Sequence, residues 1–410
     1  MFIRYLRLCL VLSSLSIFTA QLDAQNHEFS GISRFSLINT NADKSFLNEG
    51  TDIVRHDRNG FSLTQAALAI ESDWGNGISS EITTFFHDDG DLSLGLSEVF
   101  IKYKPLQRAK KKWQLRLGSF YPELSFENNH TAWLSSDTYQ FSAINAWVAE
   151  EMRINGVELS YSQNGRSIRS PYSWDIRGGL FKGNDTFGSY LTWRGFAVHD
   201  RQTLFNETVR FAPYPEVLNR QTIWSPNDVQ PFREIDGRWG VYIGAHLAYL
   251  RRAELRYYFY DNRADPDKLT PERYYAWHTI FHSLSLNYQL TESTNLKMQL
   301  MDGSTLMGYR VVYADFSAAH IQVKTQISNR IKLTARAETF DVFENDNMPL
   351  DNNHSNGVSM TVNSQYEIDE HKSVGLEYSF VKNYAYNRPS LSLSPKAVVR
   401  QWQLTLELRF

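Results

Sequence analysis

The sequence predicts an all-β fold, a transmembrane antiparallel β-barrel of about sixteen strands with one constriction loop folded into its lumen. Two observations carry this prediction. Polar and apolar residues alternate along segments of about ten residues, and the mean hydropathy of the 410-residue chain is only −0.43. Such long amphipathic segments suit tilted strands that cross a membrane, whereas ordinary strands have about five or six residues.

The first 24 residues have the pattern of a secretory signal peptide. Arg4 and Arg7 precede an apolar stretch at 8–20, and we expect cleavage after Ala24. The stretch is shorter than the roughly 20 residues that span a membrane, which disfavours the alternative of a membrane anchor. The single cysteine, Cys9, lies within it, so the sequence excludes a disulfide scaffold and a cysteine-based zinc site.

Residues 25–410 are expected to form one barrel domain. No apolar segment of spanning length follows residue 25, so an exported chain is either soluble or a closed membrane barrel. The 42 basic and 45 acidic side chains give a net charge of −3 without a basic excess, so no nucleic-acid partner is expected. A soluble all-β fold is the alternative. Fully charged polar faces favour the barrel, as do aromatic residues at the ends of predicted strands, namely Trp113, Tyr121, Trp277, Tyr288 and Trp402.

Period-two alternation gives seventeen candidate strands. They are 28–38, 60–72, 78–87, 93–104, 113–120, 153–162, 172–182, 187–198, 237–249, 251–260, 277–289, 294–304, 311–325, 330–343, 355–368, 372–383 and 397–410. A single-chain bacterial barrel normally has an even number of strands. Either 187–198 belongs to a loop, which gives sixteen, or another strand lies near 203–212, which gives eighteen. We prefer sixteen, with long loops at 121–152 and 199–236.

The last strand alternates most clearly. Its apolar positions are Trp402, Leu404, Leu406, Leu408 and Phe410. This ending resembles the C-terminal signal that the assembly machinery of bacterial outer-membrane barrels reads. The resemblance implies insertion into the bacterial outer membrane, with that machinery and outer-membrane lipid as partners.

The run from Leu115 to Glu127 resembles the sequence that leads from a strand into the in-folded loop of phosphate-selective and related porins. The matching positions are Arg116, Gly118, Phe120, Pro122, Ser125 and Glu127. If the resemblance holds, residues 121–152 are a constriction loop. An external loop that packs on its neighbours or on a second subunit is the alternative. The substrate residues of the family do not carry over, because no ladder of lumen arginines is visible.

The resemblance and the wide lumen of a sixteen-stranded barrel together predict a porin, a passive channel for small hydrophilic solutes. We expect the constriction to carry the loop carboxylates Glu123, Glu127, Asp137, Glu150 and Glu151. Parity places charged side chains of both signs on the lumen wall, among them Arg116, Arg256, Lys297, Lys332, Arg336 and Glu338. The sequence leaves the solute and the ion preference open, and a homotrimer is a further expectation.

The sequence leaves two other functions as alternatives. A barrel closed by its loops would serve as a structural or surface-binding protein without conductance, and a barrel enzyme is the less favoured alternative. No local signature selects catalytic residues. His278 and His282 lie about 13 Å apart if they are on one strand, too far to share a metal ion. No metal site and no cofactor are predicted, and the acidic loops are expected to be solvated.

Overall fold

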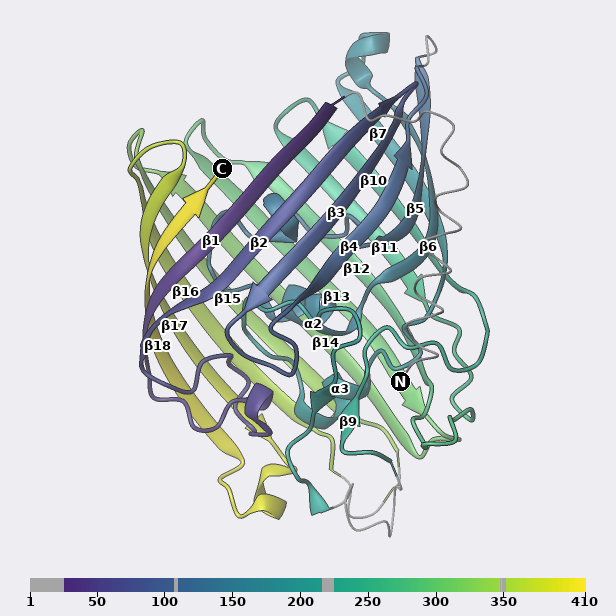
Figure 1. Ribbon diagram of the computed structural model, residues 1–410, viewed down its shortest axis with the longest axis vertical. Coiled ribbons are helices and arrows are strands. Elements are labelled where there is room, and N and C mark those ends of the chain that lie inside the picture. The colour runs from purple at the N-terminus through teal and green to yellow at the C-terminus, as the bar shows by residue number, and fades with distance from the viewer. Residues whose placement is uncertain (1–25, 107–109, 216–224, 347, 349–351) are drawn as a thin grey trace, which may run out of the picture.

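Alternating strands close the chain into an antiparallel barrel (Figure 1). The computed structural model describes residues 26–106, 110–215, 225–346, 348 and 352–410. Within these residues sixteen strands form one ring, and β1 pairs with β18 to close it. The predicted signal peptide and its cleavage after Ala24 lie outside the described residues.

The barrel strands take their bounds from the described chain. They are β1 (Asn26–Thr40), β2 (Gly60–Gly75), β3 (Ile78–His87), β4 (Leu94–Tyr103), β5 (Lys111–Phe120), β6 (Ile154–Gln163), β7 (Tyr172–Lys182), β10 (Gly240–Tyr249), β11 (Ala253–Asp261), β12 (Trp277–Gln289), β13 (Thr294–Met307), β14 (Val312–Gln326), β15 (Ile331–Glu344), β16 (Ser355–Glu367), β17 (Lys372–Ala385) and β18 (Lys396–Arg409).

The prediction of sixteen strands is confirmed, and each agrees closely with a predicted segment. The predicted strand at 187–198 is wrong. The chain there forms the short helix α3 (Ser189–Arg194), flanked by Gly188 and Gly195 with φ of 103° and 86°. A strand does not adopt such angles, and every residue of the segment is buried, so its alternation reflects no exposed face. In the region 203–212 the chain forms only β8 (Val209–Arg210), which pairs with β9 (Asp228–Val229) outside the barrel.

The polarity of the two barrel faces is the reverse of that in a soluble protein. On β18, Trp402, Leu404 and Leu406 are exposed on the outer face, whereas Gln403 and Thr405 are buried inside. Large apolar side chains are exposed in the same way on strands around the barrel. This pattern suits a lipid-facing wall and excludes the soluble all-β alternative. Among the described residues, no helix is long and apolar enough to cross a membrane.

Short turns lie at one end of the barrel and long loops at the other, as the strand count predicted (Figure 1). The β2–β3 turn contains Asn76 and Gly77 with φ of 53° and 81°, the combination that a type I′ hairpin needs. A side chain at Gly77 would also meet the Lys104 carbonyl at 2.2 Å. The turn residues therefore fix the register of this hairpin.

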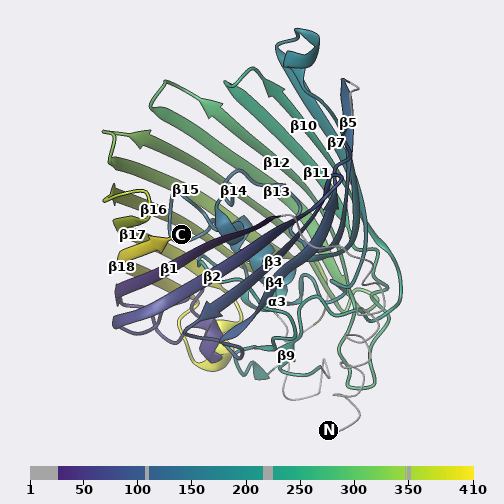
Figure 2. The same ribbon diagram turned by 45° about the horizontal axis from the view of Figure 1, so that its top comes forward.

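The loops fold back into the barrel and fill much of its interior (Figure 2). The helix α2 (Ala143–Glu151) and α3 are buried along their whole length. Trp147 of α2 stacks on Phe187 with 4.4 Å between ring centroids and meets Phe316 of the wall edge-on at 4.8 Å. An apolar core therefore lies inside the barrel, against strands that were expected to face water.

The predicted aromatic girdle is partly wrong. Trp113 and Trp402 are exposed on the outer surface, with 38% and 48% of their area accessible. Tyr121 and Trp277 instead lie inside, with 2% and 3% accessible, because the in-folded loops cover them. Tyr121 stacks on Trp133 of the same loop. Position at a strand end does not distinguish a girdle residue from one that packs against an internal loop.

Candidate functional site

The loop between β5 and β6 folds into the lumen and contacts strands on opposite sides of the barrel. Arg34 of β1 donates a hydrogen bond to the Ser135 carbonyl (3.2 Å). Arg256 of β11 donates to the Ser125 carbonyl (2.9 Å). These contacts make the segment 121–152 an internal loop, as the resemblance implied, and exclude the external alternative.

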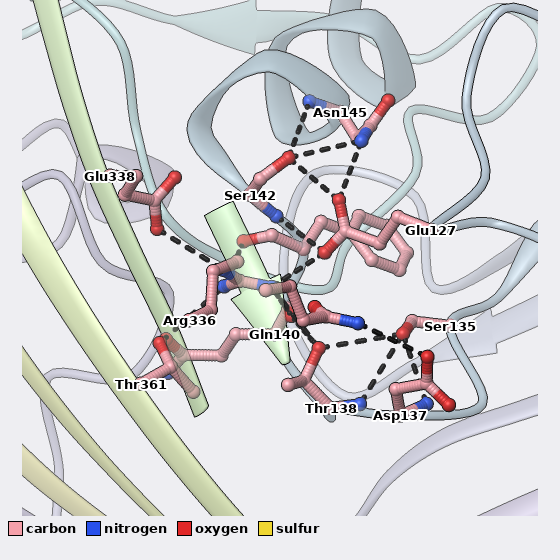
Figure 3. A network of polar contacts seen from close by, with 12 residues as sticks. Glu127, Ser135, Asp137, Thr138, Gln140, Ser142, Asn145, Arg336, Glu338 and Thr361 are labelled. Atoms are coloured by element: carbon pink, nitrogen blue, oxygen red, sulfur yellow. Dashed lines mark hydrogen bonds and ion pairs between the residues drawn. The ribbon is translucent and has the colours of Figure 1, made fainter. Parts of the chain in front are cut away.

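Glu127 anchors the start of α2 to the barrel wall (Figure 3). Its carboxylate accepts hydrogen bonds from the backbone and hydroxyl of Ser142 (2.8 and 2.6 Å) and from the Asn145 amide (2.5 Å). Arg336 of β15 lies 2.5 Å away in a fully buried ion pair. Burial alone would raise the pKa of Glu127, but Arg336 outweighs it and lowers the pKa. The carboxylate is therefore an anchor and does not face open water.

Asp137 anchors the middle of the loop. Its two oxygens lie 2.7 Å from the amino groups of Lys297 on β13 and Lys324 on β14, and Gln322 donates a further bond at 3.1 Å. Burial opposes the charge, yet the two lysines hold the pKa of Asp137 well below its usual range. The pairing therefore fixes the middle of the loop to two neighbouring wall strands.

Glu150 connects α2 to the loop between β7 and β10. It forms a two-pronged pair with Arg194 at 2.6 and 2.7 Å, and the His199 ring nitrogen lies 2.9 Å away. Burial would raise the pKa of Glu150, but Arg194 and His199 lower it to about 2. The two internal loops are therefore held together by a buried charge pair.

Glu151 lies at the start of α3. It accepts hydrogen bonds from the backbone N–H groups of Tyr190 (2.9 Å) and Leu191 (3.1 Å) and from the Trp147 indole (2.7 Å). The first N–H groups of a helix have no partner within the helix, so the carboxylate supplies one. Burial nevertheless raises the pKa of Glu151 to about 7, and the neighbouring carboxylate of Glu150 adds to the increase.

Glu123 differs from the other four predicted constriction carboxylates because its side chain is 48% exposed. It pairs with Arg177 at 3.0 Å; burial opposes the charge, but Arg177 and Arg116 lower the pKa to about 2. It lines a cavity of about 660 Å³ between the loop and the wall of β1–β5, which we call the inner cavity. The charged residues that line this cavity are Glu28, Glu71, Glu81, Glu98, Lys102, Arg116, Glu123, Glu254 and Arg256.

The inner cavity continues to the short-turn end of the barrel. A neighbouring cavity of about 430 Å³ shares Glu28, Glu71 and Lys102 with it and reaches Gly77 in the β2–β3 turn. Glu28, Glu71 and Glu81 lie directly opposite one another on β1, β2 and β3. Acidic side chains therefore predominate in this water-accessible part of the lumen.

The six predicted wall residues lie on the inner face, and most are neutralised by a partner. Lys297 and Arg336 bind the loop as described. Arg116 pairs with Glu158 at 2.9 Å and Lys332 with Glu367 at 2.6 Å. The remaining two are Arg256, which pairs with Glu254 (2.9 Å), and Glu338, which accepts from the Ala143 backbone (2.6 Å). Most of these wall charges are therefore paired. The influence of the wall on passing solutes stays a prediction.

The residues of the predicted assembly signal lie on the last strand as parity requires. Leu408 is half-buried, and Phe410 exchanges two backbone hydrogen bonds with Gly31 on β1, at 2.9 and 3.1 Å. A side-chain carbon on Gly31 would lie only 2.2 Å from the Phe410 ring, so the ring packs directly over that glycine. The role of this strand in assembly stays a prediction.

The sequence reasoning missed a second group of buried charges, which we call the outer ion-pair cluster. Its members are Arg55, Asp88, Asp89, Asp200, Arg201 and Glu207. Three loops bring them together near the long-loop end. The triplet His-Asp-Arg occurs at 56–58 and again at 199–201, and the run Asp88-Asp89-Gly90-Asp91 lies between them. These charged loop segments are the feature of the sequence that could have indicated the cluster.

One group of acidic side chains has the spacing of metal ligands. Oxygens of Asp185, Glu234 and Asp236 lie within 4.8 Å of one another. Backbone N–H groups of Ile235 and Asp236 already bind Asp185, at 2.5 and 3.2 Å. Burial raises the pKa of Asp185 to about 6. The group therefore forms a hydrogen-bonded contact within the loops.

Solved structures of outer-membrane proteins resemble this barrel. The outer membrane channel DcaP of Acinetobacter baumannii has a TM-score of 0.57 at 10% identity, and the alignment covers 96% of this chain and 99% of that one. OmpF of Salmonella typhi, in complex with daunomycin, gives 0.54 at 8% identity over 94% and 97%. An anion-selective porin from Comamonas acidovorans gives 0.51 at 13% identity over 94% and 99%.

The chain has a porin-like barrel fold. No family model and no curated protein matches its sequence. Because identities are so low, the likeness concerns the fold and not the solutes that those proteins carry. Any solute preference of the porin-like barrel therefore depends on the residues of its own lumen.

Proposed function

We propose that this porin-like barrel is an outer-membrane channel through which small hydrophilic solutes diffuse passively. The observation that carries the proposal is the inner cavity, a space of about 660 Å³ inside the barrel that is lined by charged side chains and continues to the short-turn end. An apolar outer wall around a polar, water-accessible interior is the architecture of a membrane channel. The outer-membrane location follows from the same polarity and from the fold.

In this proposal the loop at 121–152 narrows the lumen, and its carboxylates have two roles. Glu127, Asp137, Glu150 and Glu151 hold the loop in place through buried contacts. Glu123 faces the inner cavity and acts on passing ions. Four of these carboxylates therefore hold the constriction loop in place. Glu123 is the one that we expect to influence the selectivity for ions.

Planar-bilayer recording of the purified protein tests the proposal. Stepwise ohmic conductance in KCl is the expected result, and uptake of small neutral sugars into proteoliposomes should show a size limit. A protein that inserts, shifts on unboiled gels as a folded barrel and yet never conducts would contradict it.

The second candidate is a closed barrel that serves as a structural or surface-binding protein. One observation favours it: the apolar core around Trp147 fills the interior against β11, β12 and β14. Silence in the bilayer together with an intact barrel is the result that this candidate requires. We propose no catalytic role, and hydrolysis assays on lipid and peptide substrates are expected to be negative.

A homotrimer is proposed as the assembled form. The solved neighbours include a trimer form of OmpT from Vibrio cholerae, which has a TM-score of 0.52 to this chain at 9% identity. Native mass spectrometry from detergent is the direct measurement, with three copies as the expected mass. Outer-membrane lipid and the barrel-assembly machinery are the other proposed partners, and no cofactor is proposed.

A further inference from the structure

Two cavities lie along the same strands of the barrel at opposite ends. The inner cavity is lined by Ser30, Ala69 and Glu81, on β1, β2 and β3. A cavity of about 450 Å³ near the long loops, the outer cavity, is lined by Ile38 and Phe61 of β1 and β2 and by loop residues. A solute that moves along β1–β3 would pass through both.

Residues 198–207 lie between the two cavities and pack on the loop at 132–141. We call this segment the partition. Arg55 lines the outer cavity and donates to Asp200 at 2.8 Å. Two residues further on, Gln202 donates to the Ala132 carbonyl at 2.8 Å and accepts from the Tyr121 hydroxyl at 3.3 Å. Ala132 and Tyr121 both line the inner cavity, so the partition contacts residues that line each of the two cavities.

The opposite side of the lumen offers no such route for an ion. Trp147, Phe187, Phe281 and Phe316 pack there in direct ring contact. An ion that crossed this core would lose its hydration without finding polar partners, at a cost of many kcal/mol. The route along β1–β4 meets only a smaller apolar cluster, which includes Ile32, Phe85 and Leu204, and is therefore the more favourable one.

Several polar groups surround the partition at Asp200 and Gln202. The Gln65 amide donates to the Asp200 carbonyl at 2.9 Å, and the Ser97 hydroxyl donates to Gln202 at 2.6 Å. Both ring nitrogens of His87 are fully buried and have no hydrogen-bond partner among the described residues. Polar groups in such positions normally bind water, so this side of the lumen suits a hydrated path.

The outer ion-pair cluster holds the partition and is negative overall. Arg55 contacts Asp88, Asp89 and Asp200 at 2.9, 2.6 and 2.8 Å. Arg201 pairs with Asp89 at 3.0 Å and with Glu207. Four carboxylates against two guanidinium groups leave these six residues with a net charge of −2 beside the partition. Charges at a constriction of low dielectric act strongly on ions that pass.

We propose that solutes cross along β1–β4, that the partition is the gate on this path, and that the outer ion-pair cluster makes the gate selective for small cations. This inference rests on the proposed channel function and adds the position of the path, its gate and its preferred charge. Motion of one peptide segment, held by side-chain contacts, opens the connection while the barrel wall stays fixed.

Two charge variants test the selectivity. Asp200→Asn reduces the net charge of the cluster to −1, and Arg55→Gln increases it to −3. We expect the potassium-to-chloride permeability ratio to fall about two- to threefold in the first and to rise by a similar factor in the second. Arg238→Gln is the charge-matched control, because Arg238 is 54% exposed in a loop pair with Asp265. A general folding defect would shift both variants in the same direction, which distinguishes structure from selectivity.

A cross-link tests the gate. Val54 and Val198 are fully buried bridge partners between the first long loop and the partition. Cys9 is the single native cysteine, so the pair Val54→Cys and Val198→Cys supplies the only thiols after residue 9. Oxidation should lower the conductance at least fivefold, and a reductant should restore it. Val198→Cys alone, treated in the same way, is the control.

The outcomes separate this inference from the channel function. If the wild type conducts and neither the charge variants nor the cross-link alters conduction, the path lies elsewhere and the inference is overturned while the channel stands. If the wild type is silent but Arg55→Gln conducts, the partition is supported as a gate that is closed by default. If neither the wild type nor any variant conducts, both the channel function and this inference are overturned.

Discussion

Charged residues inside this barrel form buried ion pairs. Glu127 and Arg336 are both fully buried, as are Glu150 and Arg194 to within a few per cent. A buried charge without a partner is costly, so the loop and the wall must present opposite charges at matching positions. The carboxylates that the sequence marks as a constriction are for this reason mostly structural.

Arg336→Gln is expected to loosen the loop. The change leaves Glu127 as a buried charge without its main partner, which costs about 3–5 kcal/mol. Proteolysis within 121–152 should accelerate at least tenfold and the open-channel current should become noisier. Lys332→Gln is the matched control on the same strand, since Lys332 and Glu367 are about one-fifth exposed and their pair contributes under about 1 kcal/mol. Equal proteolysis of the two variants would contradict the anchoring role.

Glu123→Gln should weaken cation preference, and the effect should persist in mild acid. The pKa of Glu123 is lowered to about 2, so the carboxylate stays ionised from pH 7 down through pH 4 and loses its charge only as the pH approaches about 2. The difference in reversal potential between wild type and variant is therefore the same at pH 7 and pH 4. Glu272→Gln, in an outer loop, controls for overall charge. A difference that vanishes by pH 4 would show that Glu123 titrates normally.

At the scale of elements, the strands were predictable and the interior was not. Alternation is a local property, so strands such as β12, at 277–289, match the expected bounds. The segment 187–198 alternates too, but it packs on all sides within the barrel and forms α3. Ion pairs such as Glu127 with Arg336 join residues far apart in sequence, so no local pattern identifies them. The outer ion-pair cluster escaped prediction for the same reason.

Deletion of 128–148 is expected to widen the lumen. It removes most of α2, including Trp147, and the anchor at Asp137, while the strand pairing of the barrel does not involve these residues. Single-channel conductance should rise severalfold and the barrel should remain folded in detergent. A shorter deletion confined to the outer loop at 262–276 is the control. An unchanged conductance would contradict the constriction role of the loop.

At the scale of the whole molecule, the barrel has one side filled by an apolar core and one side that contains the cavities. The apolar core anchors α2 and α3 against β11–β15, and the cavities and the partition lie along β1–β4. The resemblance to porins implies a constriction made by one loop. Here two internal loops, at 121–152 and within 199–236, pack on each other inside the barrel.

Closure of the ring at β1 and β18 leads to the final prediction, which concerns assembly in cells. Phe410 is 67% exposed and covers Gly31, so Phe410→Ala removes little buried area and should change refolding in detergent by less than about 1 kcal/mol. If the assembly machinery reads this residue, the heat-modifiable barrel in cell membranes should fall at least fivefold. Phe29→Ala, at a β1 residue that is 59% exposed, is the matched control and should leave the level unchanged. Equal losses in both variants, or a refolding defect in vitro, would show that Phe410 contributes packing at the seam and no signal.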